Sequence, residues 1–289
     1  MSITIGIISI KGGVGKTSAV AALAAALSNE FATKTLVIDA NFSAPTLGEH
    51  VGIENPEITI HHVLDDKAQA SDAVQSTNYG FDIIPGARVY GKIEPFKLNE
   101  KLKDLKRKYE VILVDSSPNL NEEILSAMIA SDELIIVTTP DNVTLNSTLN
   151  AIRVAKARRT PITGIILNRT YNKDFELSIE DIEEASGIKV LAVIPHEIGV
   201  VEALSKKIPT TMHRNSEASN EYKKLAGSLV GKDYKEKGIK SFFKIFMKKI
   251  PKQDTRIARL PALLFRFFQN ECNRNRTTTY IPNRNGLNP

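Results

Sequence analysis

The sequence predicts an α/β protein whose mostly parallel central sheet is covered by helices on both faces. Short apolar runs alternate with helical patterns over the first 231 residues, which is typical of repeated strand–helix units. The runs are continuous Val/Ile/Leu stretches, as expected for parallel strands that are buried on both faces. The first run leads directly into a glycine-rich loop and an alanine-rich helix. These three observations define the predicted fold class.

The expected elements alternate in chain order. Strands are expected at residues 3–10, 35–39, 81–86, 111–115, 133–140, 161–167 and 190–194. Helices are expected at residues 19–27, 57–65, 98–108, 143–157, 200–207 and 216–229. Because this pattern implies right-handed crossovers, the carboxyl ends of the strands should meet at one edge of the sheet, where functional groups gather.

The glycine-rich stretch after the first strand has the pattern of a phosphate-binding loop. Its residues are Lys11, Gly12, Gly13, Val14, Gly15, Lys16, Thr17 and Ser18. Glycines let the backbone wrap around oxyanions, and the N–H groups that open the next helix point at a bound phosphate. Lys16 would reach the β- and γ-phosphates, and the Thr17 hydroxyl would bind Mg²⁺. The alternative is an ordinary glycine turn, and the flanking strand and helix argue against it.

Two carboxylates end apolar runs further along the chain. Asp115 ends the run at 111–115 and is expected to hold Mg²⁺ through water, opposite Thr17. Asp39 ends the run at 35–39 and would lie near Mg²⁺ and the γ-phosphate. For Asp39 a role in capping the next turn remains open.

The glycine loop departs from the strict phosphate-loop pattern at its head. Ile10 stands where a glycine would open the loop, and Lys11 adds a second lysine. The Lys-Gly-Gly-Val-Gly-Lys-Thr arrangement resembles the deviant Walker A motif of the MinD/ParA family of ATPases. The resemblance covers about residues 1–230. It implies a three-layer P-loop NTPase fold, Mg-ATP as ligand, and an ATP-dependent homodimer in which Lys11 reaches the partner's nucleotide.

The same resemblance assigns further site residues. It implies that Asn168 and Pro195, which follow two successive strands, frame the adenine ring, although Asn168 taken alone is more typical of a turn. Relatives usually carry Asp-x-Asp after the second strand, where the second Asp positions the attacking water, whereas this chain has Asp39-Ala40-Asn41. An amide can orient water but cannot accept its proton as a carboxylate does. We therefore expect hydrolysis to be slow, or to depend on another group or on a partner protein.

The catalytic candidates are consequently a small set of residues around the glycine loop. They are Lys11, Lys16, Asp39 and Asn41.

Charge is distributed unevenly along the chain. Residues 232–289 contain 14 Lys/Arg and 4 Asp/Glu, a net charge of +10, so the total of +5 leaves 5 − 10 = −5 for residues 1–231. An acidic body with a basic end suggests that the end meets an anionic surface. We find no signal-peptide pattern and no uncharged stretch of about 18 residues, so a cytoplasmic protein is expected. The single cysteine, Cys272, argues against an internal disulfide and against an iron–sulfur cluster.

Residues 232–252 are predicted to form a basic linker and an amphipathic helix. Five lysines and no carboxylate lie between 237 and 249. This pattern is typical of a helix in a membrane interface, resembles the membrane-targeting sequence of the MinD branch, and leaves packing on the body or on a partner as the alternative. Residues 253–289, rich in Arg and Asn, are expected to be largely disordered. The apolar stripe of the helix consists of Ile239, Phe242, Phe243, Phe246, Met247 and Ile250.

The leading hypothesis is therefore a MinD-like ATPase with an ATPase domain at 1–231. It would dimerise on Mg-ATP and bind reversibly to the inner face of the cell membrane. There it would position division or other spatially organised machinery, together with a regulatory or effector protein.

Two alternatives remain open. A ParA-like partition ATPase would bind DNA nonspecifically, and a local basic cluster would serve that function. A hydrolysis-poor, nucleotide-gated scaffold would keep ATP bound because Asn41 replaces a carboxylate. DNA is the less favoured partner, because residues 1–231 are acidic overall. The cluster consists of Arg153, Lys156, Arg158 and Arg159.

Overall fold

The computed structural model describes residues 2–235, which belong to one compact unit. The predicted membrane helix at 239–250 and the tail at 253–289 lie outside the described residues. Within the described part, no helix is both long enough and apolar enough to cross a bilayer.

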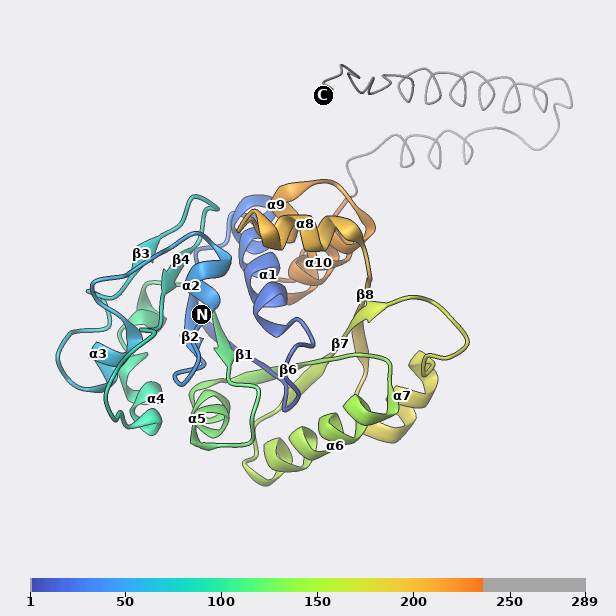
Figure 1. Cartoon of the computed structure of the whole chain (residues 1–289), viewed down its shortest axis with the longest axis horizontal. Helices are drawn as coiled ribbons and strands as arrows, with labels where there is room; N and C mark the ends of the chain where they lie inside the picture. The colour runs from blue at the N-terminus through green and yellow to red at the C-terminus, as the bar shows by residue number, and fades with distance from the viewer. Residues whose placement is uncertain (1, 236–289) are drawn as a thin grey trace, which may run out of the picture. The chain divides into compact units, whose positions relative to one another are not determined.

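An eight-stranded sheet forms the centre of the described unit, in the order β3-β4-β2-β5-β1-β6-β7-β8 (Figure 1). All strand pairs are parallel except β3–β4. The prediction of a mostly parallel sheet is thus confirmed, and β1, which precedes the glycine loop, lies inside it. The strands are β1 (Ile3–Ile8), β2 (Thr35–Ala40), β3 (Gln75–Ser76), β4 (Asp82–Ile84), β5 (Val111–Ser116), β6 (Glu133–Thr138), β7 (Ile162–Thr170) and β8 (Val190–Pro195).

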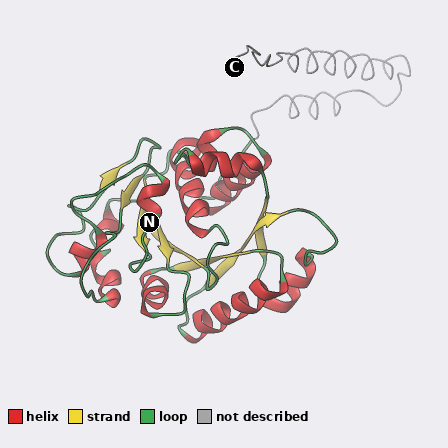
Figure 2. Cartoon of the chain, viewed as in Figure 1, coloured by secondary structure: helices red, strands yellow, loops and turns green. Residues whose placement is uncertain are grey.

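Helices cover both faces of this sheet, so the three-layer prediction is also confirmed. Figure 1 shows α1, α8, α9 and α10 on one face and α5, α6 and α7 on the other, and Figure 2 shows the same layers by type of structure. The α-helices are α1 (Lys16–Phe31), α2 (Leu47–His50), α3 (Ile60–Leu64), α4 (Leu98–Lys101), α5 (Glu122–Ala130), α6 (Asn142–Ala157), α7 (Ile179–Ser186), α8 (Ile198–Ser205), α9 (Thr210–His213) and α10 (Glu217–Leu229); the 3₁₀ turns are η1 (Pro95–Lys97) and η2 (Leu105–Arg107).

Some helix predictions were wrong in extent, and four helices, α2, α5, α7 and α9, were not predicted. Of the predicted helix at 57–65, only α3 (Ile60–Leu64) is helical. The predicted helix at 98–108 is divided into α4 and the 3₁₀ turn η2. Helix α5 is capped by Asn121, whose side chain accepts the Ile124 N–H. Helix α7 begins with a Ser178 capping box and ends at a left-handed Gly187. Both cap signals are present in the sequence and could have revealed these helices.

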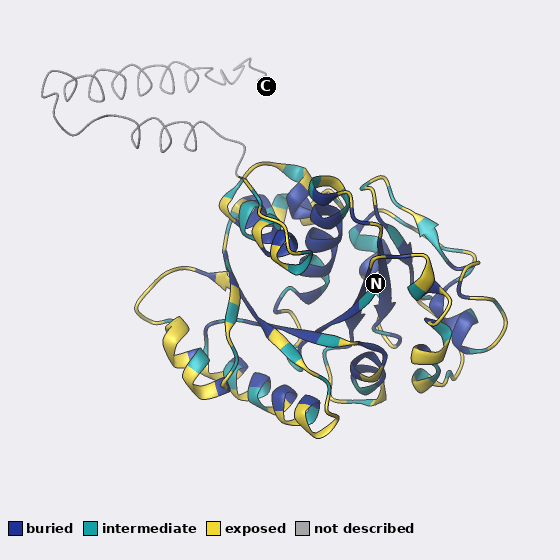
Figure 3. Ribbon diagram, turned by 180° about the vertical axis from the view of Figure 1, so that it is seen from behind, coloured by how far each residue is buried: buried dark blue, intermediate teal, exposed yellow. Residues whose placement is uncertain are grey.

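Helix α1 is buried on nearly all sides, which explains its run of alanines. Residues 19–27 are all buried, and α1 packs with α9 and α10 on one side of the sheet. Figure 3 shows α1 and most of the central strands in dark blue, whereas the edge strand β8 and the outer side of α6 carry teal and yellow. Small side chains allow the backbone of α1 to approach the strands and α10 closely. The helix that follows the glycine loop is therefore held by the core itself.

This packing predicts that a larger side chain at a buried position of α1 destabilises the protein. Ala24 is fully buried, so Ala24→Leu should lower the free energy of unfolding by about 1–3 kcal/mol through overpacking. The matched control is Ala157→Leu at the exposed end of α6, which should change it by less than about 0.5 kcal/mol. Urea denaturation of both variants measures the difference, and equal stabilities would contradict the packing described here.

Candidate functional site

The glycine loop joins β1 to α1 at the carboxyl edge of the sheet. Gly13 and Gly15 have φ angles of 79° and 91°, in the left-handed region that favours glycine. A Cβ atom on Gly15 would lie only 2.2 Å from Nδ2 of Asn168, so a larger residue is excluded here by contact as well. Helix α1 begins at Lys16, with no acidic residue in its first turn. Its free N–H groups and positive dipole end suit an anion.

Lys16 and Asp115 form a buried ion pair beside the start of α1. Lys16 Nζ lies 3.2 Å from Asp115 Oδ1, and the two side chains are 7% and 1% exposed. The other carboxylate oxygen of Asp115, Oδ2, is buried without a hydrogen-bond partner among the described residues. The predicted Lys16–phosphate contact therefore requires Lys16 to exchange Asp115 for the phosphate. Thr17 and Ser18, half-buried, follow in the first turn of α1.

Asp39 stands directly beside Asp115, because β2 and β5 are parallel neighbours in register at these two residues. Burial, followed by the negative charge of Asp115, raises the pKa of Asp39 to about 8, against hydrogen bonds from the backbone N–H groups of Leu47 and Asn41. Asp39 and Asp115 thus form a pair of adjacent buried carboxylates, and the one cation beside them, Lys16, does not balance both negative charges.

Mg²⁺ fits this arrangement. Among the described residues Asp115 Oδ2 has no hydrogen-bond partner, and burial beside Asp115 raises the pKa of Asp39, so a divalent cation would suit both carboxylates. No group of three or more His, Cys, Asp or Glu residues that could hold a metal occurs among residues 2–235. Mg²⁺ usually keeps several waters and binds through one or two carboxylates and substrate phosphates. Asp39, Asp115 and the Thr17 hydroxyl are the residues that would hold it.

The side chain of Asn41 is engaged in its own loop. Its amide donates to the Ala44 carbonyl, and its backbone N–H donates to Asp39 Oδ1 at 3.2 Å. The Leu47 N–H donates to Asp39 Oδ2 at 3.0 Å, so Asp39 also shapes this loop. A carboxylate at position 41 could not make the bond to Ala44, since it has no N–H to donate.

A contact between Ser43, in the loop that follows β2, and Glu123, in the first turn of α5, was missed by the sequence analysis. The backbone N–H and the hydroxyl of Ser43 both donate to Glu123 Oε1, the former at 3.0 Å. Glu123 is only 9% exposed although it lies in the first turn of α5. Pairing across 80 positions leaves no local signal in the sequence. The chain segments that follow Asp39 and Asp115 are thereby linked.

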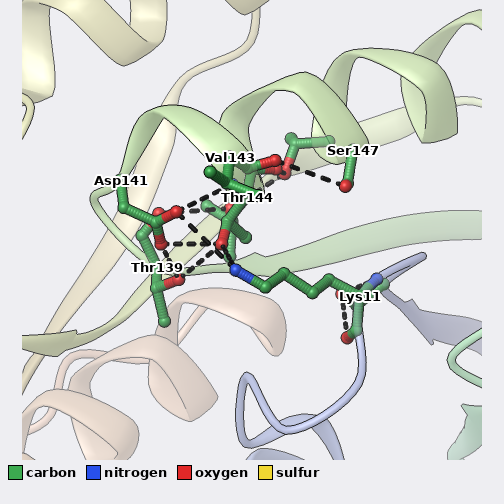
Figure 4. A network of polar contacts seen from close by, with 9 residues as sticks. Lys11, Thr139, Asp141, Val143, Thr144 and Ser147 are labelled. Carbon is green, nitrogen blue, oxygen red and sulfur yellow. Dashed lines mark hydrogen bonds and ion pairs between the residues drawn. The ribbon is translucent and has the colours of Figure 1, made fainter.

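Lys11 contacts the start of α6 in the same chain (Figure 4). Its Nζ donates to the Thr144 hydroxyl at 2.8 Å and lies 3.7 Å from Asp141 Oδ1. Asp141 caps α6 by accepting the Thr144 N–H, and it also accepts the hydroxyls of Thr139 and Thr144. Burial acts to raise the pKa of Asp141, but these hydrogen bonds and the charge of Lys11 hold it at about 2. The Lys11 side chain remains 39% exposed at the edge of the sheet.

Asn168 and Pro195 lie at the ends of the adjacent strands β7 and β8. Arg169 has a φ angle of 58°, and the β7–β8 register shifts between Asn168 and Thr170. Such a bulge re-aims neighbouring side chains. Asn168 Nδ2 donates to the Val14 carbonyl of the glycine loop at 2.7 Å. Asn168 therefore supports the loop, and its contact with adenine stays a prediction.

This contact predicts a general loss of phosphate binding when Asn168 is truncated. Asn168→Ala removes a buried hydrogen bond to the glycine loop, so affinity for tripolyphosphate and for ATP should fall by a similar factor, about tenfold. Isothermal titration calorimetry with both ligands measures this. A loss confined to ATP would instead indicate that Asn168 acts on the base alone.

Comparison with known proteins agrees with the geometry of the site. Residues 2–164, more than half of the chain, match the family model described as an AAA domain. An uncharacterised ATP-binding protein of Methanocaldococcus jannaschii is 32% identical over 255 residues, which cover 86% of this chain and 96% of that protein.

Two solved structures are also similar. The septum site-determining protein MinD from Pyrococcus horikoshii OT3, complexed with Mg-ADP, has a TM-score of 0.75 and 33% identity, and the match covers 79% of this chain and 96% of that one. A chain of the MinC:MinD cell division protein complex of Aquifex aeolicus has a TM-score of 0.73 and 26% identity, with coverages of 82% and 99%. The chain therefore belongs to the AAA-domain family of P-loop ATPases, in its MinD/ParA branch.

Proposed function

We propose that this protein is a MinD-like ATPase that dimerises on Mg-ATP and attaches reversibly to the cell membrane from the cytoplasm. The observation that carries the ATPase part is the buried Lys16–Asp115 pair at the start of α1, next to Asp39. A triphosphate at the glycine loop offers Lys16 a stronger anion than one carboxylate. The complex of the Pyrococcus relative with Mg-ADP supports the same choice of ligand.

The reaction is attack of water on the γ-phosphate. Lys16 stabilises negative charge on the transferred phosphoryl group, and the N–H groups of the glycine loop hold the phosphates in place. Thr17, Asp39 and Asp115 would hold Mg²⁺, which would supply further positive charge near the phosphates. Asn41 orients water but takes no proton from it.

Lys11 is the residue assigned to the dimer. It lies at the carboxyl edge of the sheet and is partly exposed, which suits a role toward a partner's nucleotide. In the single chain it is held by Thr144 and Asp141, and both groups are exchanged for phosphate oxygens when Lys11 turns to the partner. An exposed ion pair of this kind contributes little stability, so breaking it costs little free energy.

Membrane attachment is assigned to the stripe at 239–250, whose lysines suit anionic lipids. One such helix binds weakly, whereas two in a dimer act together and gain roughly 10²-fold or more in avidity. ATP thereby controls the membrane-bound fraction. A regulatory partner is expected to act on the dimer, as the Aquifex MinC:MinD complex suggests for that protein. The cellular role would be to position division or other spatially organised machinery.

We predict that ATP, but not ADP, converts the full chain to a dimer that floats with anionic liposomes. Lys16→Ala should lose both effects because it loses the phosphate contact. Replacing Phe242 and Phe246 by glutamate should abolish flotation and leave the ATP-dependent dimer, because only the apolar stripe changes. Light scattering and liposome flotation measure the two effects. Equal flotation with ATP and ADP would contradict the proposal.

We further predict that Asn41→Asp raises the hydrolysis rate at saturating ATP. The new carboxylate loses the bond to Ala44 and becomes free to position water and accept its proton. General base catalysis contributes about 10²–10⁴-fold, and at least a tenfold gain is expected here. Phosphate release, with and without anionic liposomes, measures the rate. An unchanged rate would show that the amide does not limit turnover.

DNA binding is the second candidate function. Four exposed cations lie at the end of α6 and just beyond it, and they could contact phosphates. Such binding would weaken steeply with salt, whereas attachment through an apolar stripe would persist. The four residues are Arg153, Lys156, Arg158 and Arg159.

A further inference from the structure

A histidine lies buried between two loops at the carboxyl edge of the sheet. His61, in α3, is only 2% exposed. Its ring Nε2 lies 2.9 Å from the Phe42 carbonyl oxygen in the loop that follows β2, and its Nδ1 lies 3.0 Å from the Ala87 amide nitrogen in the loop that follows β4. Strands β2 and β4 are parallel neighbours, so both loops leave the sheet at the same edge. The sequence analysis assigned His61 no role.

These two contacts fix the protonation of the ring. The Ala87 N–H is a donor, so Nδ1 of His61 accepts and carries no proton. Nε2 therefore carries the single proton of a neutral ring and donates it to the Phe42 carbonyl. A second proton, on Nδ1, would face the Ala87 N–H and would break that hydrogen bond. The neutral ring of His61 consequently holds both loops, and the charged ring would release one of them.

The surroundings of His61 favour the neutral ring. Burial, as the largest cause, lowers the pKa of His61 from its usual 6.5. The hydrogen bond to the Phe42 carbonyl and the charge of Glu123 oppose this shift, and the nearby His62 adds to it. The ring packs edge-on against Phe42, with centroids 5.9 Å apart, and lies 5.2 Å from the ring of Tyr90. The charged side chains that line the cavity of about 450 Å³ next to this ring are Arg88, Lys92, Glu122 and Glu123. At neutral pH His61 is therefore uncharged.

The Phe42 carbonyl belongs to a peptide unit that is held at both ends. The N–H of the same unit is that of Ser43, and it donates to Glu123 Oε1 at 3.0 Å. A trans peptide unit is planar, so hydrogen bonds on its two opposite sides fix its orientation. Asn41 directly precedes Phe42 in the chain. His61 therefore helps to set the position of Asn41, although the two residues lie on different elements.

We propose that His61 is a positioning residue for Asn41, and that its neutral ring keeps the loop after β2 in the form that orients the attacking water. This inference rests on the proposed function, because it needs hydrolysis at the glycine loop. It deepens that function by naming a contact that regulates the same site. A proton on His61 releases the Ala87 N–H and loosens the loop that carries Asn41, whereas the phosphate contacts lie on other chain segments.

The first test replaces the ring by side chains that keep or lose its two hydrogen bonds. His61→Gln retains an acceptor and an N–H donor side by side in one amide, whereas His61→Leu has neither. His61→Leu should lower turnover at saturating ATP at least about tenfold and leave ATP affinity within about twofold, because loop position changes and phosphate binding does not. His61→Gln should restore most of the turnover. The matched control is His62→Gln, which keeps the Thr59 capping box of α3 and should change neither quantity.

Hydrogen exchange of the nucleotide-free full chain gives a readout that does not depend on hydrolysis. In His61→Leu the amides of Ser43 and Ala87 should exchange at least about tenfold faster than in the wild type, because their loops are no longer joined. The amides of α10 should exchange as before. In His61→Gln all of these amides should exchange at the wild-type rate.

The pH dependence of turnover separates positioning from packing. Because the folded-state pKa of His61 lies below 6.5, the bridge is intact above pH 6.5 and is lost as the pH falls through that folded-state pKa. The ratio of wild-type turnover to that of His61→Gln should therefore be constant above pH 6.5 and fall below it. Asp39 titrates in both proteins, so its effect cancels in this ratio.

The outcomes distinguish this inference from the proposed function. Equal turnover in the wild type and His61→Leu, or a ratio of wild type to His61→Gln that stays constant from about pH 7.5 to about pH 5, would overturn the positioning role while ATP hydrolysis itself stands. If His61→Leu exchanges faster throughout the chain, the pH-dependent ratio decides. A wild-type protein that hydrolyses no ATP would overturn the proposed function and this inference together, and hydrogen exchange would still show whether His61 joins the two loops.

Discussion

The buried pair of Lys16 and Asp115 is the interaction on which the site depends. Removing two charges from water costs several kcal/mol per ion, so each must find a partner inside the protein. Here they satisfy one another, and within residues 2–235 the second carboxylate oxygen of Asp115 has no hydrogen-bond partner. Asp39 lies next to it and stays short of positive charge. The site is consequently arranged so that a triphosphate and a divalent cation can replace internal contacts with better ones.

The core holds this site in place. Helix α1 is buried between the sheet and α10, and the same helix begins with Lys16 directly after the loop. Neighbouring strands β5 and β6 flank β1 on both sides. The phosphate loop is therefore a short connection between two buried elements, which fixes the direction of its N–H groups.

Three hydrogen-bonded contacts join chain segments at the carboxyl edge of the sheet. Ser43 bonds to Glu123, Lys11 to Thr144, and Asn168 to the Val14 carbonyl. Each joins segments that are at least 80 positions apart. Two of these contacts involve the glycine loop itself, since Lys11 and Val14 belong to it, so a ligand bound there would lie next to residues that contact α6 and the end of β7.

Local residue patterns alone determined the parallel sheet, the glycine loop and the two carboxylates, because apolar runs, glycines and strand-ending acids are local signals. They did not predict α2, α5, α7 or α9, and they did not show that η2 would divide a predicted helix. Only tertiary structure decided that Lys16 pairs with Asp115, that Asn168 supports Val14, and that Ser43 pairs with Glu123. Those contacts depend on strand order and register, which bring together residues that no local pattern connects.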